Sequence, residues 1–202
     1  MNWDWKPLIF IAMIAYGGWQ YFSHKPIAIK TPGVLVASEP LQTAVGSAPS
    51  LTLDHYRVEP LAAYSIEARV LGTKDYQIGQ GADISPLDFA VGWGAMSDSA
   101  VLEHISISQG NRFYYWHVNE FPIPRGEIES HSANMHLIPA NSTVERALKN
   151  VRPGNLVRLR GWLVVVSDNT GWQWRSSLSR TDTGNGACEL MWVETVETGT
   201  VN

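Results

Sequence analysis

Several stretches of the chain have the apolar and polar pattern of strands. Residues 64–71 alternate apolar and polar side chains with a period of two, which is typical of a half-buried strand. Residues 155–166 are largely apolar and predict a central strand. Two runs separated by a Gly-Asn turn predict a hairpin, and two further runs near the C-terminal end predict shorter strands. These four runs are 105–108, 112–118, 172–178 and 187–196.

Three stretches have helix signals instead. At 85–91 a serine that can cap a helix precedes a proline that fits its first position, so a short helix is predicted. A second short helix is predicted at 99–104. Residues 142–145 have the form of a capping box, and the apolar residues that follow recur at helical spacing. They predict a helix over 143–151.

This order of elements predicts a β-rich α+β fold. We expect a small curled antiparallel sheet or a partly open barrel, with one or two short helices and an N-terminal transmembrane helix. The segment PGNLVRLRGWLVVV at 153–166 resembles a strand of small barrels in which a polar turn leads a strand into the core. Oligonucleotide/oligosaccharide-binding barrels are among them. The resemblance implies an OB-like barrel and transfers no functional residues.

The beginning of the chain predicts a membrane anchor over residues 1–22. Residues 7–22 carry no charge, and as a helix they would cover about 24 Å of a hydrocarbon layer that is roughly 30 Å thick. Aromatic residues lie on both sides of the apolar stretch, as they do at membrane interfaces. A signal peptide cleaved after Ala15–Gly17 and a buried helix are the alternatives.

The anchor leads to a prediction of organisation and location. Residues 23–50 are rich in proline and small residues and predict an extended tether, with a packed loop as the alternative. Residues 51–202 then form one β-rich globular domain. The two sides of the anchor carry similar numbers of lysines, so the excess of positive charge that marks the cytoplasmic side does not decide the orientation. The short stretch before the anchor favours a cytoplasmic N-terminus. We expect a single-pass protein whose domain is exported to the periplasm or the exterior.

Composition narrows the classes of function. The chain has 202 residues, of which 45% are hydrophobic and 17% charged, as expected for a folded domain with a real core. A net charge of -4 without a long basic run argues against nucleic acid as a partner. The single cysteine, Cys188, excludes an intramolecular disulfide and a multi-cysteine zinc site. We predict no cofactor and no metal.

One candidate site contains histidines. His131, Asn134 and His136 could support acid-base chemistry, with Asp88 as a further acidic group and Cys188 as a nucleophile. However, residues five apart point to opposite faces of a strand and lie about 140° apart on a helix. Histidines with a structural role, and a cysteine buried in the core, are therefore the alternatives.

A second candidate is a binding surface near the C-terminal end. Trp172 and Trp174 share one face of a predicted strand, and Arg175 follows them on the other face. Together with the amide of Asn134, they could bind a sugar chain or an extended peptide. The alternative is that these tryptophans fill the core.

Two functions follow from these candidates. The absence of a catalytic signature favours a membrane-tethered, non-enzymatic binding module that presents its domain to an envelope protein or polymer. The alternative is a membrane-associated hydrolase that uses His131 and His136. Convergence of the two imidazoles in a cleft with a carboxylate would support the hydrolase, whereas burial apart from one another would support the module.

Overall fold

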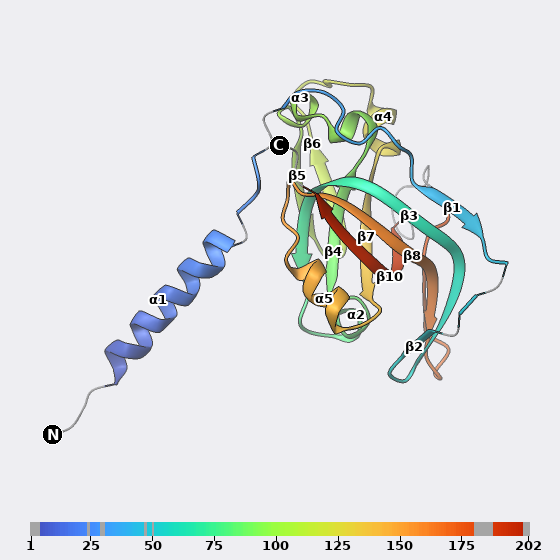
Figure 1. Ribbon diagram of the computed structural model, residues 1–202, viewed down its shortest axis with the longest axis horizontal. Coiled ribbons are helices and arrows are strands. Elements are labelled where there is room, and N and C mark those ends of the chain that lie inside the picture. The colour runs from blue at the N-terminus through green and yellow to red at the C-terminus, as the bar shows by residue number, and fades with distance from the viewer. Residues whose placement is uncertain are drawn as a thin grey trace.

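We describe the protein from a computed structural model, in which residues 5–23, 25–28, 31–46, 48–49, 51–179 and 188–199 are placed (Figure 1). The helices are α1 (Lys6–Ser23), α2 (Gln80–Ile84), the 3-10 turn η1 (Gly94–Ser97), α3 (Ser99–Leu102), α4 (Arg125–Ser130) and α5 (Ser142–Lys149). The strands are β1 (Leu41–Ala44), β2 (Leu51–Leu53), β3 (Tyr56–Asp75), β4 (Leu87–Gly92), β5 (Ser106–Gly110), β6 (Phe113–His117), β7 (Ser132–Pro139), β8 (Leu156–Ser167), β9 (Gln173–Arg175) and β10 (Glu189–Gly199).

Eight of the described strands form one mixed sheet, in the order β1-β3-β4-β7-β10-β8-β9, with β2 also paired to β3. Strand β10 runs parallel to β7 and antiparallel to β8. The long strand β3 pairs with β4 and also with β8, so the path β3-β4-β7-β10-β8 returns to β3. Strands β5 and β6 form a separate hairpin. The largest core cluster takes side chains from strands all along this path. Its members include Ile66 of β3, Phe89 of β4, Leu137 of β7 and Leu159 of β8.

The predicted fold class is wrong in the form of its sheet and in its transmembrane helix. The predicted antiparallel sheet or partly open barrel is replaced by a mixed sheet, because β7 and β10 pair in parallel. The chain between them contains α5 and the long strand β8, and a parallel pair needs a connection of this kind. A pattern read along the sequence predicts strands but does not show this pairing.

The predicted membrane anchor is also wrong. The segment does form a helix, α1, but no helix among the described residues is long and apolar enough to cross a membrane. Lys6 lies at its start, and Gly17, Gly18 and Gln20 interrupt the apolar sequence in its second half. A single-pass location with an exported domain, which depended on this anchor, is therefore not supported.

The segment that follows α1 contacts the rest of the chain. The backbone N–H of Ile27 donates to the carbonyl of Pro153 at 2.7 Å, and the N–H of Val36 donates to Ser97 Oγ at 3.0 Å. Strand β1 then pairs antiparallel with residues 62–65 of β3. These contacts agree with the alternative in which residues 23–50 form a loop packed on the domain. The domain boundaries at residues 22 and 50 stay predictions.

Two local predictions need correction. Residues 85–91 lie mainly in strand β4 and not in a helix. Ser85 ends α2 at its C-terminal side, and its Oγ lies within hydrogen-bond distance of the carbonyls of Leu87 and Leu137 instead of capping the start of a new helix. The predicted helix at 143–151 is confirmed as α5, but its cap is Asn141. The side-chain Oδ1 of Asn141 accepts hydrogen bonds from the backbone N–H groups of Thr143 and Val144 in the first turn of α5.

Candidate functional site

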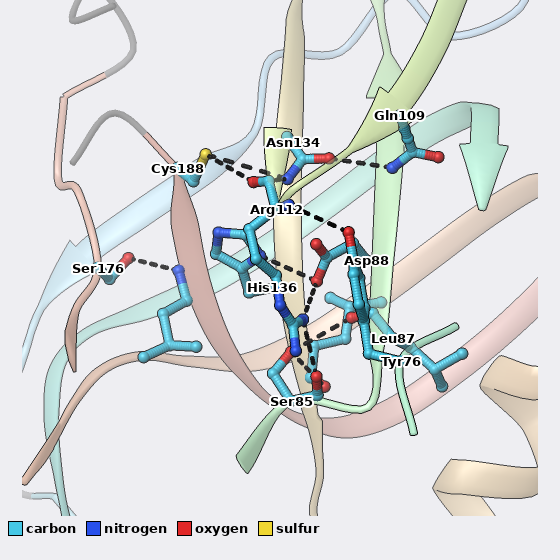
Figure 2. Close-up of polar contacts among 12 residues, drawn as sticks. Tyr76, Ser85, Leu87, Asp88, Gln109, Arg112, Asn134, His136, Ser176 and Cys188 are labelled. Carbon is cyan, nitrogen blue, oxygen red and sulfur yellow. Dashed lines mark hydrogen bonds and ion pairs between the residues drawn. The ribbon is translucent and has the colours of Figure 1, made fainter. Parts of the chain in front are cut away.

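A charged cluster lies where β4 and β7 pair (Figure 2). Asp88 of β4 is directly opposite His136 of β7 in the strand register. The Oδ1 atom of Asp88 accepts a hydrogen bond from His136 Nδ1 at 2.9 Å and another from Arg112 Nη1 at 2.8 Å. Asp88 is 1% exposed and His136 is 3% exposed. A carboxylate can only accept, so Nδ1 of the imidazole carries the proton in this contact.

Arg112 reaches the cluster from the turn of the β5–β6 hairpin. Asn111 and Arg112 both have positive φ values, 52° and 68°, a pattern that usually places glycine second in such two-residue turns. The side chain of Arg112 nevertheless passes inward, where its Nη1 also donates to the carbonyl of Ser85 at 2.9 Å. The turn therefore holds a non-glycine residue in a disfavoured conformation, and its side chain partners a buried carboxylate.

Aromatic rings cover the guanidinium and the imidazole. The Cζ atom of Arg112 lies 3.6 Å from the centre of the Tyr76 ring and 5.5 Å from the Trp174 ring. The Trp174 ring also packs on His136, with 4.8 Å between ring centroids. Burial raises the pKa of the Tyr76 hydroxyl, and the negative charge of Asp88 raises it further. Tyr76 consequently stays neutral and donates or accepts as a phenol across the physiological pH range.

A second layer fixes the backbone of Arg112. Asn134 Nδ2 donates to the Arg112 carbonyl at 3.0 Å, and Asn134 Oδ1 accepts from Gln109 Nε2 at 3.0 Å. The Cys188 thiol lies 3.8 Å from the same carbonyl and 4.0 Å from Asn134 Nδ2. Residues from the hairpin, from β7 and from the position just before β10 thus meet at one peptide group, as Figure 2 shows.

The structure brings together some of the predicted site residues and separates others. His136, Asn134, Cys188 and Trp174 all surround Arg112. His131 lies elsewhere: its Nε2 is 3.4 Å from Glu39 Oε1, and its ring packs near Trp93. The two histidines therefore do not converge.

The other two predicted binding residues, Trp172 and Arg175, lie close to Trp174 along the chain. The Trp172 ring is half-buried and packs near Tyr56, at 6.5 Å between centroids. Arg175 is exposed, next to the half-buried Trp174 on β9. The structure thus leaves Trp174 and Arg175 at the surface end of the cluster.

Sequence reasoning missed Arg112, Tyr76 and Gln109. The available signal was an arginine directly after a Gly-Asn pair, where a two-residue turn would favour glycine. Among the described residues, no group of three or more His, Cys, Asp or Glu side chains could hold a metal ion. The glycine-rich loop around Gly184 and Gly186 lies outside the described residues.

Asp88 and His136 form a hydrogen-bonded pair with the orientation of a catalytic dyad, but the pair is buried. A carboxylate that holds Nδ1 of a histidine is the arrangement that prepares Nε2 as a base. Here, however, both groups are almost fully buried beneath Arg112 and Trp174. Removal of one partner from a buried ion cluster leaves an uncompensated charge, so Arg112, Asp88 and His136 depend on one another.

Comparison of the chain with models of protein families, with curated proteins and with solved structures finds no match. The resemblance of residues 153–166 to small binding barrels gains no support from these comparisons.

Proposed function

We propose that the chain is a non-enzymatic binding module that recognises a protein partner through the β9 edge of its sheet. The observation that carries the proposal is the position of Trp174. Its half-buried ring packs on His136 and Arg112. The indole is therefore held in one orientation before a partner binds. Tryptophan and arginine are the residues most often found at the energetic centre of protein interfaces.

The strand that carries Trp174 supports the same interpretation. β9 is the last strand of the sheet order and, within the described residues, pairs with β8 alone. Its second edge offers backbone N–H and C=O groups to an added strand of a partner. Gln173 and Arg175 are exposed on either side of Trp174 and would contact such a strand. Burial of Asp88 and His136 agrees with a role in holding this edge.

Photocrosslinking tests the proposal. Benzoylphenylalanine at Gln173 on β9 should capture a discrete protein in cells, whereas the same group at exposed Arg146 on α5 should not. In binding measurements with the captured protein, Arg175→Ala should weaken affinity about tenfold or more, and Arg146→Ala should have no effect. Equal crosslinking at both positions, or equal affinity of the two alanine variants, would overturn the proposal.

A hydrolase is a second candidate, and the contact between Asp88 and His136 at 2.9 Å favours it. In that mechanism His136 would act as the base and Cys188 as the nucleophile, without His131. The test is turnover of a panel of nitrophenyl esters by the full chain. Loss of turnover in both Cys188→Ala and His136→Gln would support it, and an inactive wild-type protein would remove it.

A further inference from the structure

The β5–β6 hairpin has one packed face and one open face. On the packed face, Ile107 and Trp116 contact an apolar cluster around Met96 and Ile128. The other pair on this face bonds to β7, since Gln109 bonds to Asn134 and the hydroxyl of Tyr114 lies 2.6 Å from that of Ser132. The hairpin is therefore fixed to the domain through one face, and the described residues of its other face are exposed or half-buried.

The open face combines aromatic rings with very small residues. The strand register places Gly110 opposite Phe113, Ser108 opposite Tyr115, and Ser106 opposite His117. Residues directly opposite one another share a face of an antiparallel pair and contact each other across it. Glycine and serine are too small to cover the ring opposite them, and Phe113 is half-buried whereas Tyr115 is exposed. Tyr115 is 53% exposed, and the centroids of Phe113 and Tyr115 are 6.5 Å apart.

We propose that this face, which we call the ring face, binds a neutral oligosaccharide. It consists of Ser106, Ser108, Gly110, Phe113, Tyr115 and His117. A sugar ring has an apolar C–H surface bordered by hydroxyl groups. The rings of Phe113 and Tyr115 complement that surface, and the serine and tyrosine hydroxyls with the His117 imidazole complement its edges.

The chemistry of the ring face argues against other occupants. It contains no Lys or Arg, and the chain has a net charge of -4, so neither nucleic acid nor an acidic glycan is attracted to it. It also contains no aliphatic side chain, although an apolar protein contact would be expected to include some. Aromatic rings set among hydroxyl groups leave a neutral, hydroxyl-rich ligand as the best match.

The test is calorimetric titration of the full chain with hexasaccharides of glucose and of N-acetylglucosamine, in both α- and β-linked forms. At least one should bind. Tyr115→Ala should weaken binding about tenfold or more, because the stacking ring is removed, whereas Tyr115→Phe should retain most of the affinity. The matched control is Phe121→Ala, since Phe121 is 55% exposed and contacts Trp116 outside the ring face.

Three results would overturn this inference. The first is no binding of any hexasaccharide at millimolar concentration, and the second is wild-type affinity in Tyr115→Ala. The third is a dimer in analytical ultracentrifugation that Tyr115→Ala dissociates, because a second copy would then cover the ring face. Arg175→Ala should leave sugar binding unchanged, so failure at the ring face and failure at the β9 edge can be told apart.

Discussion

Replacement of Arg112 tests two effects together: the stability that its ion pair with Asp88 contributes, and the stability that its positive φ value costs. In Arg112→Met, the buried Asp88 keeps its hydrogen bond to His136 but loses the one from the guanidinium. Arg112→Gly removes the same partner and in addition relieves the positive φ of 68°. Both variants destabilise the protein, and the glycine variant is expected to be the milder of the two.

The magnitudes follow from the geometry. Removal of one partner of a buried ion pair costs about 3–5 kcal/mol, and the lower end applies here because His136 still satisfies Asp88. A left-handed conformation costs a non-glycine residue about 1–2 kcal/mol, which Arg112→Gly recovers. The expected loss in free energy of unfolding is therefore about 3 kcal/mol for the methionine variant and about 1–2 kcal/mol for the glycine variant.

Urea unfolding followed by far-ultraviolet circular dichroism measures both losses. With an m-value of about 2 kcal/mol/M, Arg112→Met should lower the midpoint by about 1.5 M. The control is Arg175→Met, because Arg175 is exposed and its replacement should leave the midpoint unchanged. A methionine variant as stable as the wild type would refute the role of the cluster, and a glycine variant less stable than the methionine variant would refute the strain in the turn.

Three further predictions concern other parts of the fold. Gly161→Ala should abolish folding or cost more than about 3 kcal/mol in thermal unfolding, because an added Cβ would collide with the carbonyl of Trp192 on β10. Asn141→Ala should cost about 1 kcal/mol in urea unfolding, since it removes the cap of α5. The hydrogen bond from the Thr170 side chain lowers the pKa of Asp168, so its contribution is present above the unfolded-state pKa and is lost as the pH falls through that value and the lower folded one. Asp168→Asn should therefore flatten the acid side of the stability profile.

The sequence predicts best those elements whose pattern has a single explanation. The predicted strand over 155–166 is β8, and its central position is confirmed by its pairing with both β3 and β10. The hairpin at 105–118 and the helix at 143–151 are also confirmed. In each case the alternation of side chains, the turn or the helical period agrees with the environment in the folded protein.

The two strands that carry the charged cluster show why other elements escape prediction. Every residue of β4 is buried, so the strand has no alternation, and the Ser-Pro pair before it imitates a helix start. β7 is an interior strand, but it contains the buried polar residues Asn134 and His136. Its sequence therefore lacks the apolar run expected of a buried strand. Their partners lie on β4 and on the β5–β6 hairpin, and no local pattern shows such partners.

The residues that are locally unfavourable all belong to the charged cluster of Asp88, His136 and Arg112, and this gives the cluster a further role. Asp88 in a fully buried strand, His136 in its neighbour and Arg112 in a glycine-like conformation are each unfavourable alone. A slip of one residue between β4 and β7 would place Asp88 opposite Met135 or Leu137 and break the hydrogen bond between the buried Asp88 and His136. The hydrogen bond between Asp88 and His136 therefore favours the observed register of β4 and β7, and the ion pair of Arg112 with Asp88 attaches the hairpin to it. The β9 edge at Trp174 and the ring face at Tyr115 are then held in a fixed relation to the same buried charges.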